Sequence, residues 1–291
     1  MKENQTITYK IADVKMQLHM PWEERISNAF RPFVSEEEDY DWKITFQETE
    51  VLEKFEIPPL FQNNVFRVYE RADGNFVRQY YNDRPDLTPY VSIAVDVAKK
   101  QVMTEYLPEA AGKFGAGEAD FFCIAFEKIL MEEQAMILHA SCVDTPLGGI
   151  LFSGHSGVGK STQGDLWCRY GGAKLLNGDR PIIRQIENEW RAYGSPYAGS
   201  SGCHVDESCG IRAIVFIQQA KECQVRKVQG IEKFRKIFGN LTVNLWDQAY
   251  VTKASAFVQR LAEAVPVYEL KCTKDQEAVL ALQKFLENEK H

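Results

Sequence analysis

The chain has 291 residues, of which 45% are hydrophobic and 26% are charged, and its net charge at pH 7 is -7. This composition is typical of a globular protein with room for one large domain or two ordinary ones. The negative net charge argues against a nucleic-acid partner, because a broad excess of positive charge is needed to neutralise phosphates. No stretch approaches the ~20 apolar residues that cross a bilayer, and the start lacks the apolar core of a secretion signal, so no membrane partner is expected.

The cysteines predict a cytoplasmic protein. There are seven, an odd number, spread along the sequence without close pairs, which is typical of reduced thiols. The one cluster, CHVDESC at residues 203–209, has a five-residue gap and no second pair. A loop with incidental cysteines is therefore favoured over a zinc site.

The first hundred or so residues alternate apolar with polar positions and are rich in β-branched and aromatic side chains, which predicts strands. The runs are residues 6–20, 42–48, 65–83 and 89–107. Within the third run, Asp73-Gly74 indicates a hairpin turn. Residues 1–110 are therefore expected to form a mainly β N-terminal domain, for which acceptor recognition is one open role.

The second part of the chain has a different pattern. Residues 107–120 are rich in Gly, Ala and Pro and predict a linker. A helix is expected over residues 119–134, where apolar side chains recur at helical spacing. Strands and helices then alternate to the end, so residues 118–291 are expected to form an α/β domain. The predicted fold class of the whole chain is α/β (α+β).

The segment GHSGVGKS, residues 154–161, matches the phosphate-binding loop pattern G-x-x-x-x-G-K-[ST]. An apolar run, GILFS, precedes it, and a predicted helix, STQGDLWCRYG, follows it. Glycines allow backbone angles that other residues avoid, so that N–H groups can turn towards phosphate oxygens. The N-terminus of the following helix adds about half a positive charge at the same place.

This loop predicts a site for ATP and Mg²⁺. The Lys160 ammonium would reach the β- and γ-phosphates, and the Ser161 hydroxyl would ligate Mg²⁺. A chance glycine-rich turn is the alternative interpretation. The expected nucleotide-binding residues are Gly154, His155, Ser156, Gly157, Val158, Gly159, Lys160, Ser161 and Thr162.

The surroundings of the loop resemble the HPr kinase/phosphorylase family and its relatives with the phosphoenolpyruvate carboxykinase-like fold. The resemblance rests on ILHASCVDTPLGGILFSG before the loop and AKLLNGDR soon after its helix, and it covers residues 137–184. His139 precedes Gly154 by fifteen residues, and Asp179 follows Lys160 by nineteen. The resemblance implies a C-terminal P-loop nucleotide domain of that fold, in an uncharacterised branch of the family.

The resemblance also implies roles for individual residues. His139 falls on the histidine beside the transferring phosphoryl group, Asp179 on a metal-binding aspartate and Arg180 on the family arginine. With Lys160 they form the expected catalytic set, and Asp179 shares the metal with Ser161. The alternatives are a buried strand histidine for His139 and a surface strand residue for Arg180.

One position departs from the family. The resemblance implies an aspartate pair whose first member accepts the proton of the attacking hydroxyl, but Gly178 stands there. Asp179 itself, His139, or the HVDES segment with His204 and Asp206 are candidate substitutes. Alternatively, Asn-Gly at this point is just a tight turn in a protein that binds nucleotide without transferring phosphate.

A long Gly/Ser-rich segment, residues 193–210, is interpreted as either a substrate loop or a plain surface connection. Arg212 follows it and is a candidate contact for the γ-phosphate, as arginines are at many phosphoryl-transfer sites.

The leading hypothesis is an ATP- and Mg²⁺-dependent kinase, which transfers the γ-phosphate to a hydroxyl of a peptide, a small protein or a small metabolite. The alternative is a nucleotide-binding regulatory or scaffold protein without turnover, because the base position is Gly178. Carboxykinase chemistry on a keto acid would require further metal-binding groups that the sequence does not reveal. The expected partners are a nucleotide and an acceptor, and a homo-oligomer stays open.

Overall fold

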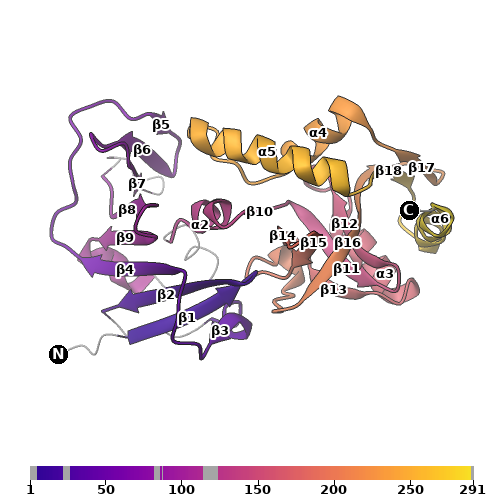
Figure 1. Cartoon of the computed structure of the whole chain (residues 1–291), viewed down its shortest axis with the longest axis horizontal. Helices are drawn as coiled ribbons and strands as arrows, with labels where there is room; N and C mark the ends of the chain where they lie inside the picture. Colours follow the sequence, from indigo (N-terminus) through magenta and orange to yellow (C-terminus); the bar gives the residue numbers. More distant parts are fainter. Residues whose placement is uncertain (1–4, 22–26, 82–85, 87, 114–123, 290–291) are drawn as a thin grey trace. The chain divides into compact units, whose positions relative to one another are not determined.

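The computed structural model of the chain describes residues 5–21, 27–81, 86, 88–113 and 124–289. They belong to two compact units, Met1–Glu132 and Glu133–His291, each built on a large sheet (Figure 1). The chain is thus a mixed α/β protein, as predicted. The division follows the helix α2 (Phe126–Glu132), whereas the sequence pattern suggested a boundary between residues 110 and 118. Half of the expected linker and the start of the expected helix lie outside the described residues.

The sheet of the first unit has nine strands in its described part, in the order β3-β1-β2-β4-β9-β8-β7-β6-β5. Neighbouring strands run antiparallel except for β2–β4 and β4–β9, which are parallel. The strands are β1 (Gln5–Ile11), β2 (Val14–Met20), β3 (Val34–Ser35), β4 (Trp42–Glu48), β5 (Phe61–Gln62), β6 (Phe66–Glu70), β7 (Phe76–Tyr80), β8 (Val91–Asp96) and β9 (Gln101–Tyr106). Two short 3-10 helices accompany them, η1 (Arg31–Phe33) and η2 (Pro108–Lys113).

Hairpins account for three of the predicted strand runs. The turn at Gly74, with φ of 80°, joins β6 to β7 as predicted. The run 6–20 is divided into β1 and β2 by a two-residue turn at Ala12 and Asp13, with φ of 52° and 59°. Both values lie in the left-handed region that such hairpin turns require, but neither residue is a glycine, so the sequence carries no clear turn signal there.

A buried ion pair links the helix α2 to the sheet of the first unit. The Arg78 guanidinium on β7 donates to the Glu127 carboxylate of α2, and both side chains are buried. A buried charge is stable only with such a partner. This ion pair binds the helix to the sheet of the first unit.

The second unit also has nine strands in the part of it that the structure describes. Its main order is β10-β14-β15-β16-β12-β11-β13, and β18 pairs with both β16 and β17. The strand β16 runs parallel to both β12 and β18. The strands are β10 (Ala135–Ile137), β11 (Ala140–Thr145), β12 (Gly148–Ser153), β13 (Lys174–Asn177), β14 (Ile182–Ile186), β15 (Glu189–Tyr193), β16 (Ser208–Gln219), β17 (Gln224–Lys227) and β18 (Val267–Cys272).

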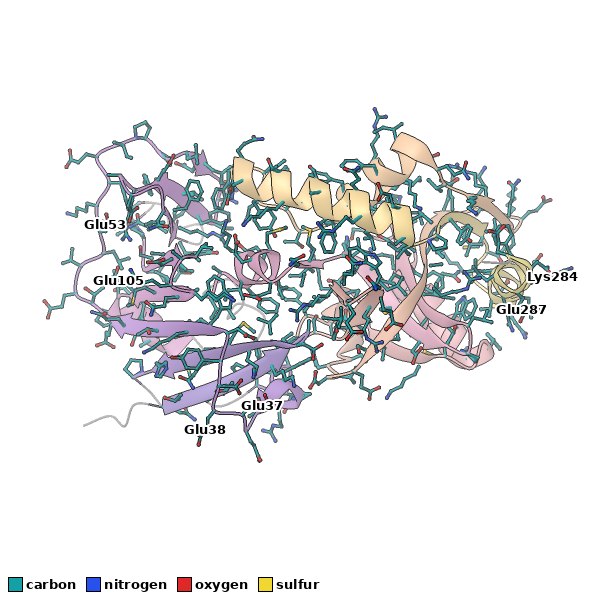
Figure 2. All side chains as sticks on the ribbon, in the orientation of Figure 1. Glu37, Glu38, Glu53, Glu105, Lys284 and Glu287 are labelled. Carbon is teal, nitrogen blue, oxygen red and sulfur yellow. The ribbon has the colours of Figure 1, made fainter. Side chains whose placement is uncertain are left out.

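The helices of the second unit are α3 (Lys160–Tyr170), α4 (Gly230–Phe238), α5 (Gln248–Ala264) and α6 (Gln276–Asn288), with the 3-10 helix η3 (Gly199–Ser201). The helices α3 and α6 share a core with β11, β12, β16 and β18, which includes Trp167, Phe152 and Leu282. Figure 2 shows Lys284 and Glu287 of α6 projecting from its opposite side. No helix in the described ranges is long and apolar enough to span a membrane.

Candidate functional site

The glycine-rich loop, residues 154–159, joins the end of β12 to the first residue of α3. This is the strand–loop–helix order that the sequence predicts. Gly154, Gly157 and Gly159 have φ of 139°, 77° and 113°, which other residues rarely adopt. The loop therefore depends on glycine for its conformation at all three positions.

Two side chains hold the loop in place. Val158 is buried in the core that α3 shares with the sheet. The Gln219 side-chain amide, at the end of β16, donates to the carbonyl oxygens of Val158 (3.1 Å) and Gly157 (3.4 Å). Sequence analysis did not identify Gln219. Gln219 is a polar residue at the carboxyl end of a strand that runs parallel to β12. That position indicates a contact with the loop only when the strand order is known.

Lys160 is a buried cation without a carboxylate partner among the described residues. Its side chain is 7% exposed, and its ammonium donates only to the carbonyl oxygens of Gly154 (3.3 Å) and His155 (3.4 Å). Among the described residues, no carboxylate lies within ion-pair distance of it. Burial lowers the pKa of Lys160, Asp179 opposes that shift and Arg180 adds to it. A buried cation in this state favours an anionic ligand.

The N-terminus of α3 strengthens this preference for an anion. Its N-cap residue is Gly159, which has no side chain to accept hydrogen bonds from the first amides of the helix. Ser161 and Thr162 lie in this first turn, where Ser161 is exposed and Thr162 is half-buried. The free amides and the helix dipole thus point towards the same space as the loop.

His139, Asp179 and Arg180 lie together, as the sequence predicts. His139 Nε2 is 3.2 Å from Asp179 Oδ1, and Arg180 Nε is 3.4 Å from Asp179 Oδ2. His139 occupies a bend between β10 and β11, where its N–H donates to Asn240 O (2.8 Å) and its carbonyl accepts from Ser153 Oγ (2.9 Å). These two hydrogen bonds fix the backbone that carries the imidazole ring.

The electrostatics of His139 connect this group to the glycine-rich loop. Burial lowers the pKa of His139, the positive charges of Lys160 and Arg180 lower it further, and Asp179 opposes them. These effects favour the neutral imidazole. The same interactions place Lys160 close enough to Asp179 and Arg180 for their charges to act on it.

Asn177 is the buried residue that shapes the Asp179–Arg180 turn. Its Oδ1 accepts hydrogen bonds from the N–H groups of Asp179 (2.9 Å) and Arg180 (2.6 Å). Its Nδ2 donates to the carbonyl oxygens of Tyr197 (3.0 Å) and Ser195 (3.3 Å). The Asn-Gly pair is thus a turn, but one whose side chain joins two segments. The sequence had offered only the local turn.

Residues 194–207, here called the covering segment, lie against this turn. A Cβ built on Gly178 would be 2.2 Å from Ser201 Oγ and 3.1 Å from Ala198 O. A Cβ built on Gly199 would be 2.8 Å from Asp179 Cβ. Position 178 therefore has no room for a carboxylate. The glycine is required for close packing, and a simple replacement by aspartate cannot restore a base there.

Two earlier candidates lie elsewhere. Arg212 donates to the carbonyl oxygens of Leu286 (2.9 Å) and Glu289 (3.2 Å) at the end of α6, so the prediction that it contacts the γ-phosphate is wrong. The HVDES segment, residues 204–208, contains Glu207, which pairs with Lys174 at the opposite end of β13 from Asp179. It therefore runs away from the site, which does not favour His204 or Asp206 as a base.

A metal at this site would need ligands from outside the protein. Nowhere in the described ranges do three His, Cys, Asp or Glu side chains gather to hold a metal ion. Cys203 and Cys209 are both free thiols. Ser161 and Asp179 suit a magnesium ion that takes its remaining ligands from phosphate and water oxygens.

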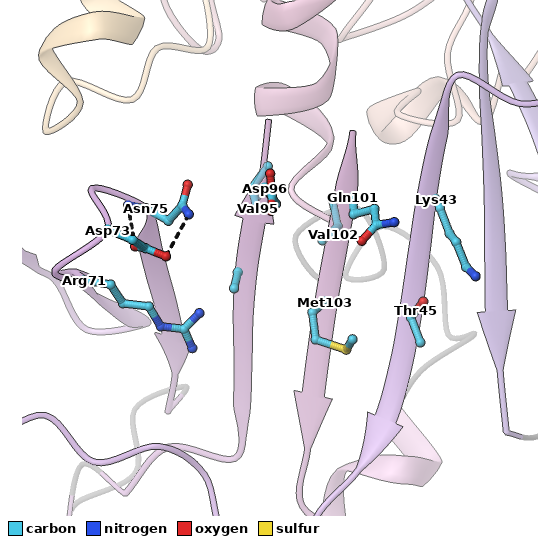
Figure 3. Close-up of a pocket in the computed structure, with 11 residues that line it drawn as sticks. Lys43, Thr45, Arg71, Asp73, Asn75, Val95, Asp96, Gln101, Val102 and Met103 are labelled. Atoms are coloured by element: carbon cyan, nitrogen blue, oxygen red, sulfur yellow. Dashed lines mark hydrogen bonds between the residues drawn. The ribbon is translucent and has the colours of Figure 1, made fainter. Parts of the chain in front are cut away.

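A separate pocket of about 420 Å³ lies on the sheet of the first unit (Figure 3). Its polar wall includes Asp73, which accepts hydrogen bonds from the backbone and side-chain nitrogens of Asn75, each at 3.0 Å. Arg71 and Lys43 also line the pocket. The pocket contains none of the residues that the sequence singled out for nucleotide binding, metal binding or catalysis.

Comparisons with known proteins give little further information. No family model matches the chain, and no curated protein matches it. Among solved structures, the HPr(Ser) kinase/phosphatase from Coxiella burnetii is similar, with a TM-score of 0.33 and 13% identity, covering 52% of this chain and 88% of that chain. At that TM-score the match assigns neither a family nor an activity to this chain.

Proposed function

We propose that the second unit binds ATP with Mg²⁺ and transfers the γ-phosphate to a hydroxyl acceptor. The observation that carries this proposal is the buried Lys160 ammonium, which has only two long hydrogen bonds to loop carbonyls. Such a group is costly to keep charged unless an anion completes its surroundings. The uncapped start of α3 faces the same space, and together they suit the phosphates of a nucleotide.

The remaining residues divide into two roles. Ser161 and Asp179 would hold Mg²⁺, which supplies charge neutralisation to the phosphate oxygens. The neutral form of His139 is favoured, and the ring contacts Asp179 Oδ1, so it positions that carboxylate without competing for the phosphate charge. Arg180 lies on the other side of the same carboxylate, where its guanidinium adds positive charge for the transferring group.

A second candidate function is nucleotide binding without turnover. The specific observation in its favour is that Ser201 and Ala198 fill the space next to Gly178, so that this position can carry no base. Phosphoryl transfer depends mainly on positioning and charge, so the absence of one base does not remove the first proposal. The two candidates differ in whether ADP is formed.

Calorimetric titration with Mg-ATP tests the binding site. The native chain should bind, and Lys160→Ala should weaken binding by roughly tenfold or more, because a charge-assisted contact to phosphate is lost. Lys174→Ala is the matched control, since this exposed lysine pairs with Glu207 and should leave the affinity unchanged. No binding by the native chain at millimolar Mg-ATP would refute both functions. The chain is then incubated with Mg-ATP and hydroxyl acceptors. Release of ADP identifies a kinase, and absence of ADP identifies a protein that binds nucleotide without turnover.

A further inference from the structure

The covering segment packs against the turn that carries Asp179. Gly199 has φ of 55° and begins η3, and a Cβ built on it would be 3.4 Å from Asp179 Oδ2. The backbone of this turn therefore packs close to the Asp179 side chain. His139 contacts the other oxygen of the Asp179 carboxylate, and the charge of that carboxylate acts on Lys160. The turn therefore adjoins the group formed by His139, Asp179 and Lys160.

Ser201 is the residue of this turn whose hydroxyl packs against Gly178. Its Oγ lies 2.2 Å from the place of a Cβ on Gly178, one residue before Asp179. The residue is exposed, and its hydroxyl donates to Ala198 O (2.6 Å) and accepts from the Cys203 N–H (3.2 Å). These contacts are local to the turn. A rotation about one side-chain bond therefore frees the hydroxyl without disturbing the core.

The neighbouring serines differ from Ser201 in ways that matter for reactivity. Ser195 is buried, and its hydroxyl donates to Arg180 O (2.7 Å), so it supports the turn and is shielded. Ser200 is exposed like Ser201 but is not among the atoms closest to Gly178. Burial and position thus single out Ser201.

We propose that Ser201 is a phosphate acceptor within the chain, so that the kinase site phosphorylates its own covering segment. This inference rests on the proposed function. Ser201 Oγ forms a bond to the γ-phosphorus, and the bond from that phosphorus to the β–γ bridging oxygen breaks. ADP leaves with the electron pair of the broken bond. The hydroxyl proton passes to solvent water, which reaches this exposed residue.

The product would change the covering segment. A phosphoserine carries a charge of about -1.5 to -2 at pH 7, and here it would adjoin Asp179. The phosphate and the Asp179 carboxylate would repel each other, so the modified turn moves away from the carboxylate and opens the site. Phosphorylation of Ser201 would therefore precede the binding of any larger acceptor.

The test uses the full chain, Mg-ATP carrying a labelled γ-phosphate, and peptide mapping by mass spectrometry. The expected result is a phosphate on Ser201 that is lost in Ser201→Ala, kept in Ser200→Ala and absent in Lys160→Ala. The rate per molecule should not depend on protein concentration, because donor and acceptor sites share one chain. Calorimetry with Mg-ATP on Ser201→Ala checks that the nucleotide site is intact.

The outcomes separate this inference from the proposed function. If the native chain binds Mg-ATP but Ser201 gains no label, or if Ser201→Ala is labelled equally, the inference is overturned and nucleotide binding stands. A rate that rises with protein concentration also overturns it, since the acceptor then belongs to another molecule. If the native chain fails to bind Mg-ATP, the proposed function and the inference fail together.

Discussion

Asn177→Ala should destabilise the second unit strongly. The side chain is fully buried, accepts hydrogen bonds from the N–H groups of Asp179 and Arg180, and donates one to Tyr197 O. Each such hydrogen bond contributes about 1 kcal/mol net, and each stranded buried amide adds about 1–3 kcal/mol of lost solvation. The two stranded amides are partly buried, so the expected loss in free energy of unfolding is about 3–5 kcal/mol.

Urea unfolding followed by hydrogen-exchange mass spectrometry measures this loss in each unit separately. Peptides covering residues 174–205 should exchange faster in the variant, while peptides from the first unit should be unchanged. Asn288→Ala is the control, because that exposed side chain donates only to Lys284 O near the end of α6, and it should cost about 0.5 kcal/mol or less. A loss below about 1 kcal/mol for Asn177→Ala, with unchanged exchange, would refute this account of the turn.

Two further outcomes follow from the same site. Burial, with the charge of Lys160, holds the pKa of His139 below its unfolded value of about 6.5. As the pH falls below about 6.5, the unfolded chain therefore gains a proton that the folded chain does not, and stability should fall until the folded pKa is reached. Urea unfolding at several pH values in this range gives the free energy of unfolding as a function of pH. That dependence should be shallower for His139→Gln than for the native chain, and an equal dependence would contradict the assignment. Gly178→Ala should cost about 1–3 kcal/mol by crowding Ser201, and Ser201→Gly should relieve much of that cost in a double-mutant cycle. Additive effects in that cycle would be evidence against the close packing.

The local order of the second unit could be predicted from sequence. The apolar run, the glycines and the following helical pattern indicate β12, the loop and α3, because each signal is contained within a few residues. The proximity of His139 and Asp179 was also expected, although only the family resemblance suggested it. Their chemical roles stay predictions.

Other features depend on contacts between distant segments. Gly178 was interpreted as a lost base, but it is small because Ser201 packs against it from a segment some twenty residues away. Arg212 looked like a phosphate contact, yet it caps α6 at the far end of the sequence. No local pattern reports such partners. The hairpin at Ala12 was missed for a different reason, because its turn lacks the usual glycine.

The covering segment leaves and re-enters the sheet at neighbouring points. Tyr193 at the end of β15 is paired with Ser208 at the start of β16, so the two ends of the segment are fixed to each other by the sheet. Doubling the length of such a loop adds only about 0.6 kcal/mol of closure entropy. Insertions are therefore tolerated where the segment does not contact the turn at Asn177 and Gly178. Such changes alter the cover while β12, the glycine-rich loop and α3 stay as they are.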